Sequence, residues 1–186
     1  MFGLRDFKIV VKDLSLLLML IAVAMLLPAL VGLFYADSQD ALDDFLITAV
    51  ITGAIGAAGY FLIRRTQEMA LKHAIALIVL FWPIAAFFCS FPILTTGAAP
   101  SFTDAYFESM SGWTTTGLST ISGNVESFPH SVNLWRGMLQ FMGGIGVILI
   151  SIIVLAQART GSESISLVAS EFAIGERIRP SIWSTA

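Results

Sequence analysis

The chain has 186 residues, of which 56% are hydrophobic and 12% are charged, and its formal net charge is −3. Soluble domains carry about 25% charged residues, so this composition indicates an integral membrane protein. A net negative chain offers no basic surface for nucleic acid, and we expect no nucleic-acid partner. The single cysteine, Cys89, excludes an internal disulfide and a cysteine-based zinc cluster, and its apolar surroundings predict a packing role.

Two apolar runs within residues 1–72 predict two leading transmembrane helices. After a short amphipathic lead, residues 14–36 carry no charge and are long enough to span a bilayer with some tilt. An acidic connector, residues 37–44, separates this run from the second one, residues 45–63. Membrane lipid is therefore the expected surrounding of this part of the chain.

Small residues and a proline inside these runs predict how the two helices pack. Gly53, Gly56 and Gly59 lie three residues apart, roughly on one face, and small residues at this spacing let helix backbones approach closely. No strand precedes them and no Lys-Ser or Lys-Thr pair follows, so they do not form a nucleotide-binding loop. Pro28 predicts a kink in the first helix, which membrane helices tolerate.

Residues 73–158 predict one helix–pore-loop–helix repeat. The third span covers residues 74–91 and is expected to end at Pro92, and the fourth span begins at Leu134. A shorter, more polar segment lies between these two spans. The last residues, 159–186, predict a cytoplasmic amphipathic tail that could lie on the membrane surface or against a partner.

The segment between the third and fourth spans, SFTDAYFESMSGWTTTGLSTI (residues 101–121), predicts a re-entrant hairpin. Ser101 can cap a helix, with Asp104 three residues later in a capping-box arrangement. A helix from about Phe102 to Trp113 would be roughly 18 Å long, well short of the ~30 Å hydrocarbon core. We therefore expect a half-helix that enters the membrane and an irregular Thr/Gly segment that leaves it.

The Thr-Thr-Thr-Gly run, Thr114 to Gly117, has the chemistry of an ion filter. Irregular backbone at membrane depth occurs only where it is buried in protein or lines a wet cavity. Gly117 permits backbone angles that let successive carbonyls point one way, and a row of inward carbonyls can replace the hydration shell of K⁺. The C-terminal end of the half-helix adds partial negative charge. The alternative is a polar extracellular loop rich in Ser and Thr.

The basic residues predict the orientation. All Lys and Arg residues except Arg136 fall on one side of a four-span arrangement, so both termini are expected in the cytoplasm. Arg136 is expected to pair with Glu126, Glu108 or Asp104, or to snorkel to the headgroups; a role in repelling cations is a weaker alternative. The acidic residues gather on the outer side, where they either concentrate cations at a pore mouth or are simply solvated.

No catalytic set is present, so we expect no enzyme. His73 and His130 are predicted on opposite membrane faces, and the sequence has no nucleophile elbow, His-Glu-x-x-His motif or phosphate-cradling loop. Asp104 and Glu108 are interpreted as residues that cap the half-helix and tie it to its surroundings. In the fourth span Gly143, Gly144 and Gly146 would let the helix pass close behind the Thr/Gly segment or bend, so packing and gating both stay open.

The sequence FTDAYFESMSGWTTTGLSTI followed by LWRGMLQFMGGIGVILISIIVLA closely resembles the first pore repeat of the Trk/Ktr/HKT potassium-uptake superfamily, of the TrkH type. The resemblance implies an all-α integral membrane protein with four transmembrane helices, one re-entrant pore half-helix and a filter loop. It implies channel-like potassium uptake in which the filter backbone binds the ion at Thr114, Thr115, Thr116, Gly117 and Leu118, with K⁺ at Thr115 and Thr116.

The same resemblance implies partners and a location. Family membership implies a TrkA-like cytoplasmic nucleotide-binding regulatory subunit, a dimeric assembly, and a multi-pass protein of the bacterial cytoplasmic (inner) membrane. No covalent cofactor is expected, and K⁺ is the transported ion. The family carries four consecutive pore repeats, whereas this sequence holds one. We therefore expect an N-terminal part that needs three further repeats; the alternative is a non-conducting four-span scaffold whose hairpin is a structural plug.

Overall fold

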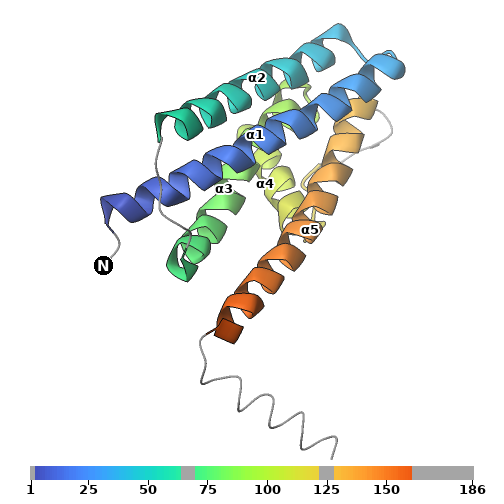
Figure 1. Ribbon diagram of the computed structural model, residues 1–186. Coiled ribbons are helices and arrows are strands. Elements are labelled where there is room, and N and C mark those ends of the chain that lie inside the picture. The colour runs from blue at the N-terminus through green and yellow to red at the C-terminus, as the bar shows by residue number, and fades with distance from the viewer. Residues whose placement is uncertain (1–2, 64–69, 122–127, 161–186) are drawn as a thin grey trace, which may run out of the picture. The chain divides into compact units, whose positions relative to one another are not determined.

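The computed structural model describes residues 3–63, 70–121 and 128–160, which form five α-helices and no strand (Figure 1). The chain divides into two units, residues 1–147 and 148–186, and the packing described below belongs to the first. The predicted tail lies outside the described residues from residue 161 onward. Three helices of the described part are long and apolar enough to cross a membrane: α1, α2 and most of α3.

The first two helices are longer than predicted. Helix α1 covers Leu4–Phe34 and helix α2 covers Gln39–Leu62, and they lie side by side in Figure 1. The predicted lead and the acidic connector are therefore mostly helical. The Asp6 carboxylate accepts a hydrogen bond from the Gly3 amide at 2.8 Å, and the Ser38 hydroxyl accepts one from the Ala41 amide at 3.3 Å. These caps start each helix early, and acidic residues near a helix N-terminus are favourable.

The predicted glycine face of α2 packs against α1. A Cβ atom added at Gly56 would lie 2.7 Å from the Ser15 carbonyl oxygen, and one added at Gly59 would overlap the Ser15 hydroxyl. At Gly53 the added atom would lie 3.3 Å from the Ala22 Cβ. The helix backbones therefore approach closely along this face, which confirms the predicted packing role.

Helix α3 covers Leu71–Thr95 and continues through Pro92, so the prediction that Pro92 ends it is wrong. A proline removes one backbone N–H and crowds the preceding turn, but membrane helices tolerate it when nearby groups satisfy the freed carbonyl. The helix ends where Gly97 adopts φ +72° and its amide donates to the Leu94 carbonyl at 3.0 Å. A left-handed glycine after a helix is a strong terminator.

The start of α3 is tied to the start of α1. The buried His73 ring accepts a hydrogen bond from the Ala70 amide at Nδ1, 3.0 Å away, and its Nε2 lies 2.7 Å from Asp6 Oδ1. Because Nδ1 is an acceptor, the proton of the neutral ring lies on Nε2 and points to the carboxylate. Lys72 Nζ lies 2.6 Å from the same oxygen. His73 therefore orders the N-termini of two helices.

Helix α4 covers Phe102–Trp113, the range expected from the sequence. The Ser101 hydroxyl accepts a hydrogen bond from the Asp104 amide at 3.2 Å, as predicted for the cap. The Trp113 ring packs edge-on against Phe81 of α3, with ring centroids 5.1 Å apart. Twelve residues are too few to cross a bilayer, so α4 differs in kind from its neighbours.

Helix α5 covers His130–Thr160 and starts four residues before the predicted fourth span. The fully buried Trp135 donates from Nε1 to the Cys89 carbonyl at 3.1 Å and meets the Phe45 ring edge-on at 6.1 Å. Trp135 thus joins α5 to α3 and α2. Cys89 is itself fully buried, in agreement with its predicted packing role.

The early start of α5 depends on a carboxylate from the connector between α1 and α2. Asp37 accepts hydrogen bonds from the backbone amides of His130 and Ser131, at 3.1 and 2.9 Å. It also accepts one from the Ser131 hydroxyl at 2.8 Å, and its Oδ1 lies 3.0 Å from His130 Nδ1. Asp37 therefore acts as the N-terminal cap of a helix 93 residues away.

We expect the substitution Asp37→Asn to make the free energy of unfolding less dependent on pH. Burial raises the pKa of the Asp37 carboxyl, but hydrogen bonds from the Ser131 amide, the His130 ring and the Ser131 hydroxyl outweigh it and hold the pKa below its usual value. The folded state therefore binds fewer protons than the unfolded state. The stabilisation is present above the unfolded pKa of about 3.9 and is lost as pH falls through the lower folded pKa.

Thermal unfolding of the purified protein between about pH 3 and pH 7 measures this dependence. Asp40→Asn, on an exposed residue of the first turn of α2, is the matched control and should behave more like the wild type. Equal acid sensitivity in the Asp37→Asn variant and the wild type would contradict the capping role.

Candidate ion-binding site

The Thr-Thr-Thr-Gly loop, residues 114–117, directs its backbone amides at the end of α4. The Thr115 amide donates to the Gly112 carbonyl at 2.9 Å. The amides of Thr116 and Gly117 both donate to the Ser111 carbonyl, at 3.0 and 3.4 Å. This is the Schellman pattern of a helix C-terminus, in which the loop amides satisfy the last helix carbonyls.

The carbonyl oxygens of the same loop are left available. Among the described residues no donor reaches the carbonyl oxygens of Thr115, Thr116 or Gly117, and all of residues 114–120 are exposed. Buried backbone carbonyls need a partner, so these oxygens require water or a cation wherever the loop lies away from bulk solvent. The Leu118 carbonyl differs, because it accepts a hydrogen bond from the Ser111 hydroxyl at 2.6 Å.

Two residues of the loop have positive φ angles. Gly117 has φ +73°, as its predicted freedom allows, and Thr115 has φ +57°. A β-branched residue in the left-handed region is uncommon and stores about 1–3 kcal/mol of strain. The left-handed conformation of Thr115 was not predicted from the sequence. The signal that could have found it is the helix end at Trp113, because a Schellman motif places a left-handed residue two positions later.

We expect Thr115→Gly to stabilise the end of α4 by about 1 kcal/mol, because glycine adopts the left-handed conformation without a Cβ penalty. Thermal unfolding of the purified protein measures the change. Thr116→Gly is the matched control, since Thr116 has no positive φ and gains nothing from a glycine. A Thr115→Gly variant no more stable than Thr116→Gly would show that residue 115 is not strained.

Helix α5 passes close behind the end of α4. A Cβ atom added at Gly143 would lie 2.8 Å from the Trp113 carbonyl carbon and would overlap its oxygen, which accepts a hydrogen bond from Trp82 Nε1 at 3.1 Å. The added atom at Gly144 would lie 3.7 Å from the Thr115 methyl group, and at Gly146 3.8 Å from the Trp82 ring. Gly143 thus has the predicted close-packing position, and α5 is helical throughout His130–Thr160.

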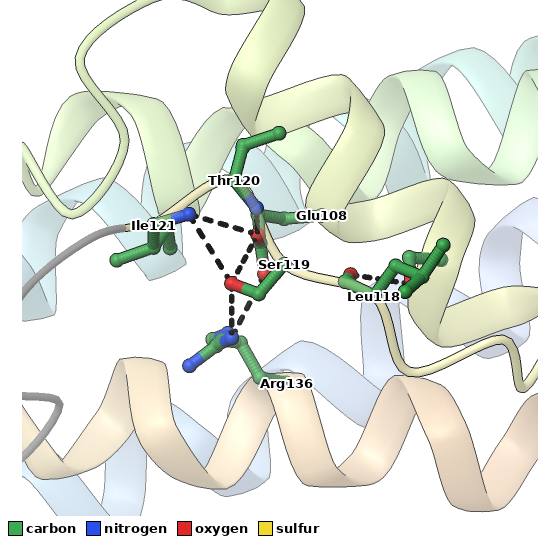
Figure 2. Close-up of polar contacts among 7 residues, drawn as sticks. Glu108, Leu118, Ser119, Thr120, Ile121 and Arg136 are labelled. Carbon is green, nitrogen blue, oxygen red and sulfur yellow. Dashed lines mark hydrogen bonds and ion pairs between the residues drawn. The ribbon is translucent and has the colours of Figure 1, made fainter.

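Arg136 of α5 pairs with Glu108 of α4, one of its three predicted partners, with Arg136 Nη2 2.8 Å from Glu108 Oε2 (Figure 2). The other carboxylate oxygen binds the segment that follows the loop: Ser119 donates to it at 2.6 Å and the Thr120 amide at 2.7 Å. The predicted role of Glu108 as a tie is therefore correct. The hydrogen bonds from Ser119 and Thr120 to Glu108 could not be predicted from the sequence, because they depend on how the chain returns past α4.

In the described part of the chain, no group of three or more His, Cys, Asp or Glu residues could hold a metal ion. His73 and His130 have separate carboxylate partners, Asp6 and Asp37. What remains in this part of the chain is the set of three loop carbonyls that accept no hydrogen bond from the described residues, with the polar ties around them.

Comparison with known proteins identifies the family of the chain. The family profile described as TrkH, cation transport protein, matches residues 41–179. An uncharacterized cation transporter of Methanocaldococcus jannaschii is 33% identical over 184 residues, which cover 97% of this chain and 37% of that protein. The Trk system potassium uptake protein TrkH of Halomonas elongata is 34% identical over 156 residues, which cover 83% of this chain and 32% of that protein.

A solved structure is also similar. The crystal structure of the potassium transporter TrkH from Vibrio parahaemolyticus matches with a TM-score of 0.75 and 32% identity, over 91% of this chain and 36% of that chain. The chain thus spans about a third of the length of these relatives. The all-α membrane fold predicted from the sequence is confirmed. The chain belongs to the TrkH family of cation transport proteins, which are transporters and not enzymes.

Proposed function

We propose that this chain provides one quarter of a potassium filter, with the backbone carbonyls of Thr115, Thr116 and Gly117 as ion ligands. The observation that carries the proposal is a difference between the amides and the carbonyls of the loop. The amides of Thr115, Thr116 and Gly117 donate to the end of α4, whereas their carbonyls accept no hydrogen bond from the described residues. Carbonyl oxygens held in a row replace the water shell of K⁺. Thr114 belongs to the same loop, and Leu118 is a weaker ligand because its carbonyl already binds Ser111.

The complete pore in this proposal needs three further repeats, because one loop occupies one side of a four-fold filter. The length of the relatives supports this, since the chain spans about a third of them. Residues 1–72 are then two leading helices, residues 73–158 the first repeat, and residues 159–186 a cytoplasmic tail. The distribution of the basic residues supports termini on the cytoplasmic side, and the family resemblance supports a bacterial inner membrane. The proposed assembly is a dimer that also binds a TrkA-like cytoplasmic nucleotide-binding regulatory subunit, as the family resemblance implies.

The test is cation flux into liposomes that contain the complete transporter. We expect K⁺ uptake that exceeds Na⁺ uptake, with Thr116→Ser close to the wild type because backbone and hydroxyl are both kept. Correctly inserted protein that carries neither cation, with or without the regulatory subunit, would reject the proposal and favour the scaffold function.

A further inference from the structure

We propose that Glu108 is a positioning residue for the ion-binding loop, residues 114–117. The Glu108 carboxylate holds the segment after the loop and thereby sets the cation selectivity of the loop. Arg136 supports this carboxylate. The inference rests on the proposed function, because selectivity presupposes a conducting loop. Four groups from two parts of the chain converge on this one carboxylate, which is 3% exposed.

The two oxygens of the Glu108 carboxylate have different hydrogen-bond partners (Figure 2). Oε1 faces the returning segment and accepts hydrogen bonds from the Ser119 hydroxyl at 2.6 Å, the Thr120 amide at 2.7 Å and the Ile121 amide at 3.4 Å. Oε2 faces α5 and accepts one from Arg136 at 2.8 Å. The carboxylate therefore joins α4, the returning segment and α5 at a single point.

The Ser119 hydroxyl completes this network. It donates its proton to Glu108 and accepts hydrogen bonds from the Ile121 amide and from Arg136 Nη2, each at 3.2 Å. One donor and two acceptor positions are the full capacity of a hydroxyl group. A fully satisfied network of this kind fixes one geometry, whereas a partly satisfied one does not.

A second tie lies one turn further along α4. The Ser111 hydroxyl donates to the Leu118 carbonyl at 2.6 Å, and residues three apart lie on the same face of a helix. Glu108 and Ser111 thus hold residues 118–121 against this face. The loop is anchored by its amides at one end and by these ties at the other. Between the anchors lie the three carbonyls that accept no hydrogen bond from the described residues.

Packing does not replace these ties. A cavity of about 320 Å³ lies between the loop and α5, lined by Gly117, Arg136 and Gln140 among others. Closely packed side chains would resist a shift of the loop backbone, but a cavity leaves room for it. The position of the Gly117 carbonyl therefore depends on the polar ties, and a small change in carbonyl position alters how well K⁺ is distinguished from Na⁺.

The test compares the ratio of K⁺ to Na⁺ flux in the complete transporter at matched membrane levels. We expect Glu108→Gln to lower this ratio by about tenfold, the lower end of the effect of one lost charged hydrogen bond. Ser119→Ala removes one tie and keeps the ion pair, and we expect a fall of roughly two- to threefold. Asp104→Asn, near the start of the same helix and outside this network, is the control and should keep the wild-type ratio.

The double variant Glu108→Arg with Arg136→Glu separates positioning from simple charge pairing. An arginine at position 108 cannot accept hydrogen bonds from Ser119 and Thr120, so we expect no recovery of selectivity. Recovery in the double variant would overturn the inference. So would an unchanged ratio in both Glu108→Gln and Ser119→Ala. In either case a wild type that still conducts K⁺ would leave the proposed function standing, whereas a non-conducting wild type would reject that function itself.

Discussion

Replacing Gly143 with alanine is expected to be among the most destabilising single changes in the first unit. The added Cβ would lie 2.8 Å from the Trp113 carbonyl carbon and would overlap the carbonyl oxygen. Backbone atoms cannot move aside as the end of a flexible side chain can. Helix α5 must therefore retreat from α4, and we expect a loss of about 3 kcal/mol in the free energy of unfolding, at the upper end of overpacking effects.

The Trp113 carbonyl has little freedom to rotate away from the new atom. It accepts a hydrogen bond from Trp82 Nε1 at 3.1 Å, and the Trp113 ring is 3% exposed and packs against Phe81. Rotation of the peptide would break the first contact. It would also disturb the loop that starts at the next residue, so flux should fall together with stability.

Two other glycines of α5 provide matched controls for Gly143→Ala. An added Cβ at Gly144 makes only an ordinary contact of 3.7 Å with the Thr115 methyl group, and at Gly137 it meets nothing within 4 Å. Gly144→Ala should be tolerated, and Gly137→Ala should stabilise by about 0.5–1 kcal/mol, since alanine is the better helix former. Thermal unfolding of the three purified variants measures the order of their stabilities. A Gly143→Ala variant as stable as Gly144→Ala would show that the helices are not in close contact.

Local sequence signals predicted the elements that depend on neighbouring residues. Ser101 and the length of the following run gave α4 its bounds, Phe102–Trp113, because capping is a short-range interaction. The spacing of the α2 glycines indicated the face that meets α1. The Thr-Thr-Thr-Gly run indicated an irregular loop because its glycine permits backbone angles that other residues avoid.

Features that depend on distant residues could not be predicted in the same way. Asp37 was assigned to an acidic surface, yet it caps α5 from 93 residues away. Arg136 had three possible carboxylate partners, and the bonds from Ser119 and Thr120 to Glu108 depend on the path of the returning segment. Pro92 was expected to end α3, but membrane helices tolerate a proline, and Gly97 sets the end of this helix.

Replacing Gly117 with serine is expected to narrow the preference of the complete transporter for K⁺ over Na⁺. Gly117 has φ +73°, and an added Cβ would lie 3.6 Å from Gln140 Nε2, an ordinary contact. Space is therefore sufficient, and the penalty is conformational, about 1–2 kcal/mol for a side chain in the left-handed region. The expected response is rotation of the peptide at residue 117, which turns one carbonyl out of the proposed ligand row.

Loss of one carbonyl should affect K⁺ more than Na⁺ if the row is matched to the water shell of K⁺, because the two ions hold water with different strength. Gly117→Asn is an informative comparison, since asparagine tolerates the left-handed conformation better than serine, and its effect should be smaller. The measurement is K⁺ and Na⁺ uptake by both variants at matched membrane levels. An unchanged K⁺ to Na⁺ ratio in Gly117→Ser would remove Gly117 from the ion site, and the free carbonyls of the loop would then need another explanation.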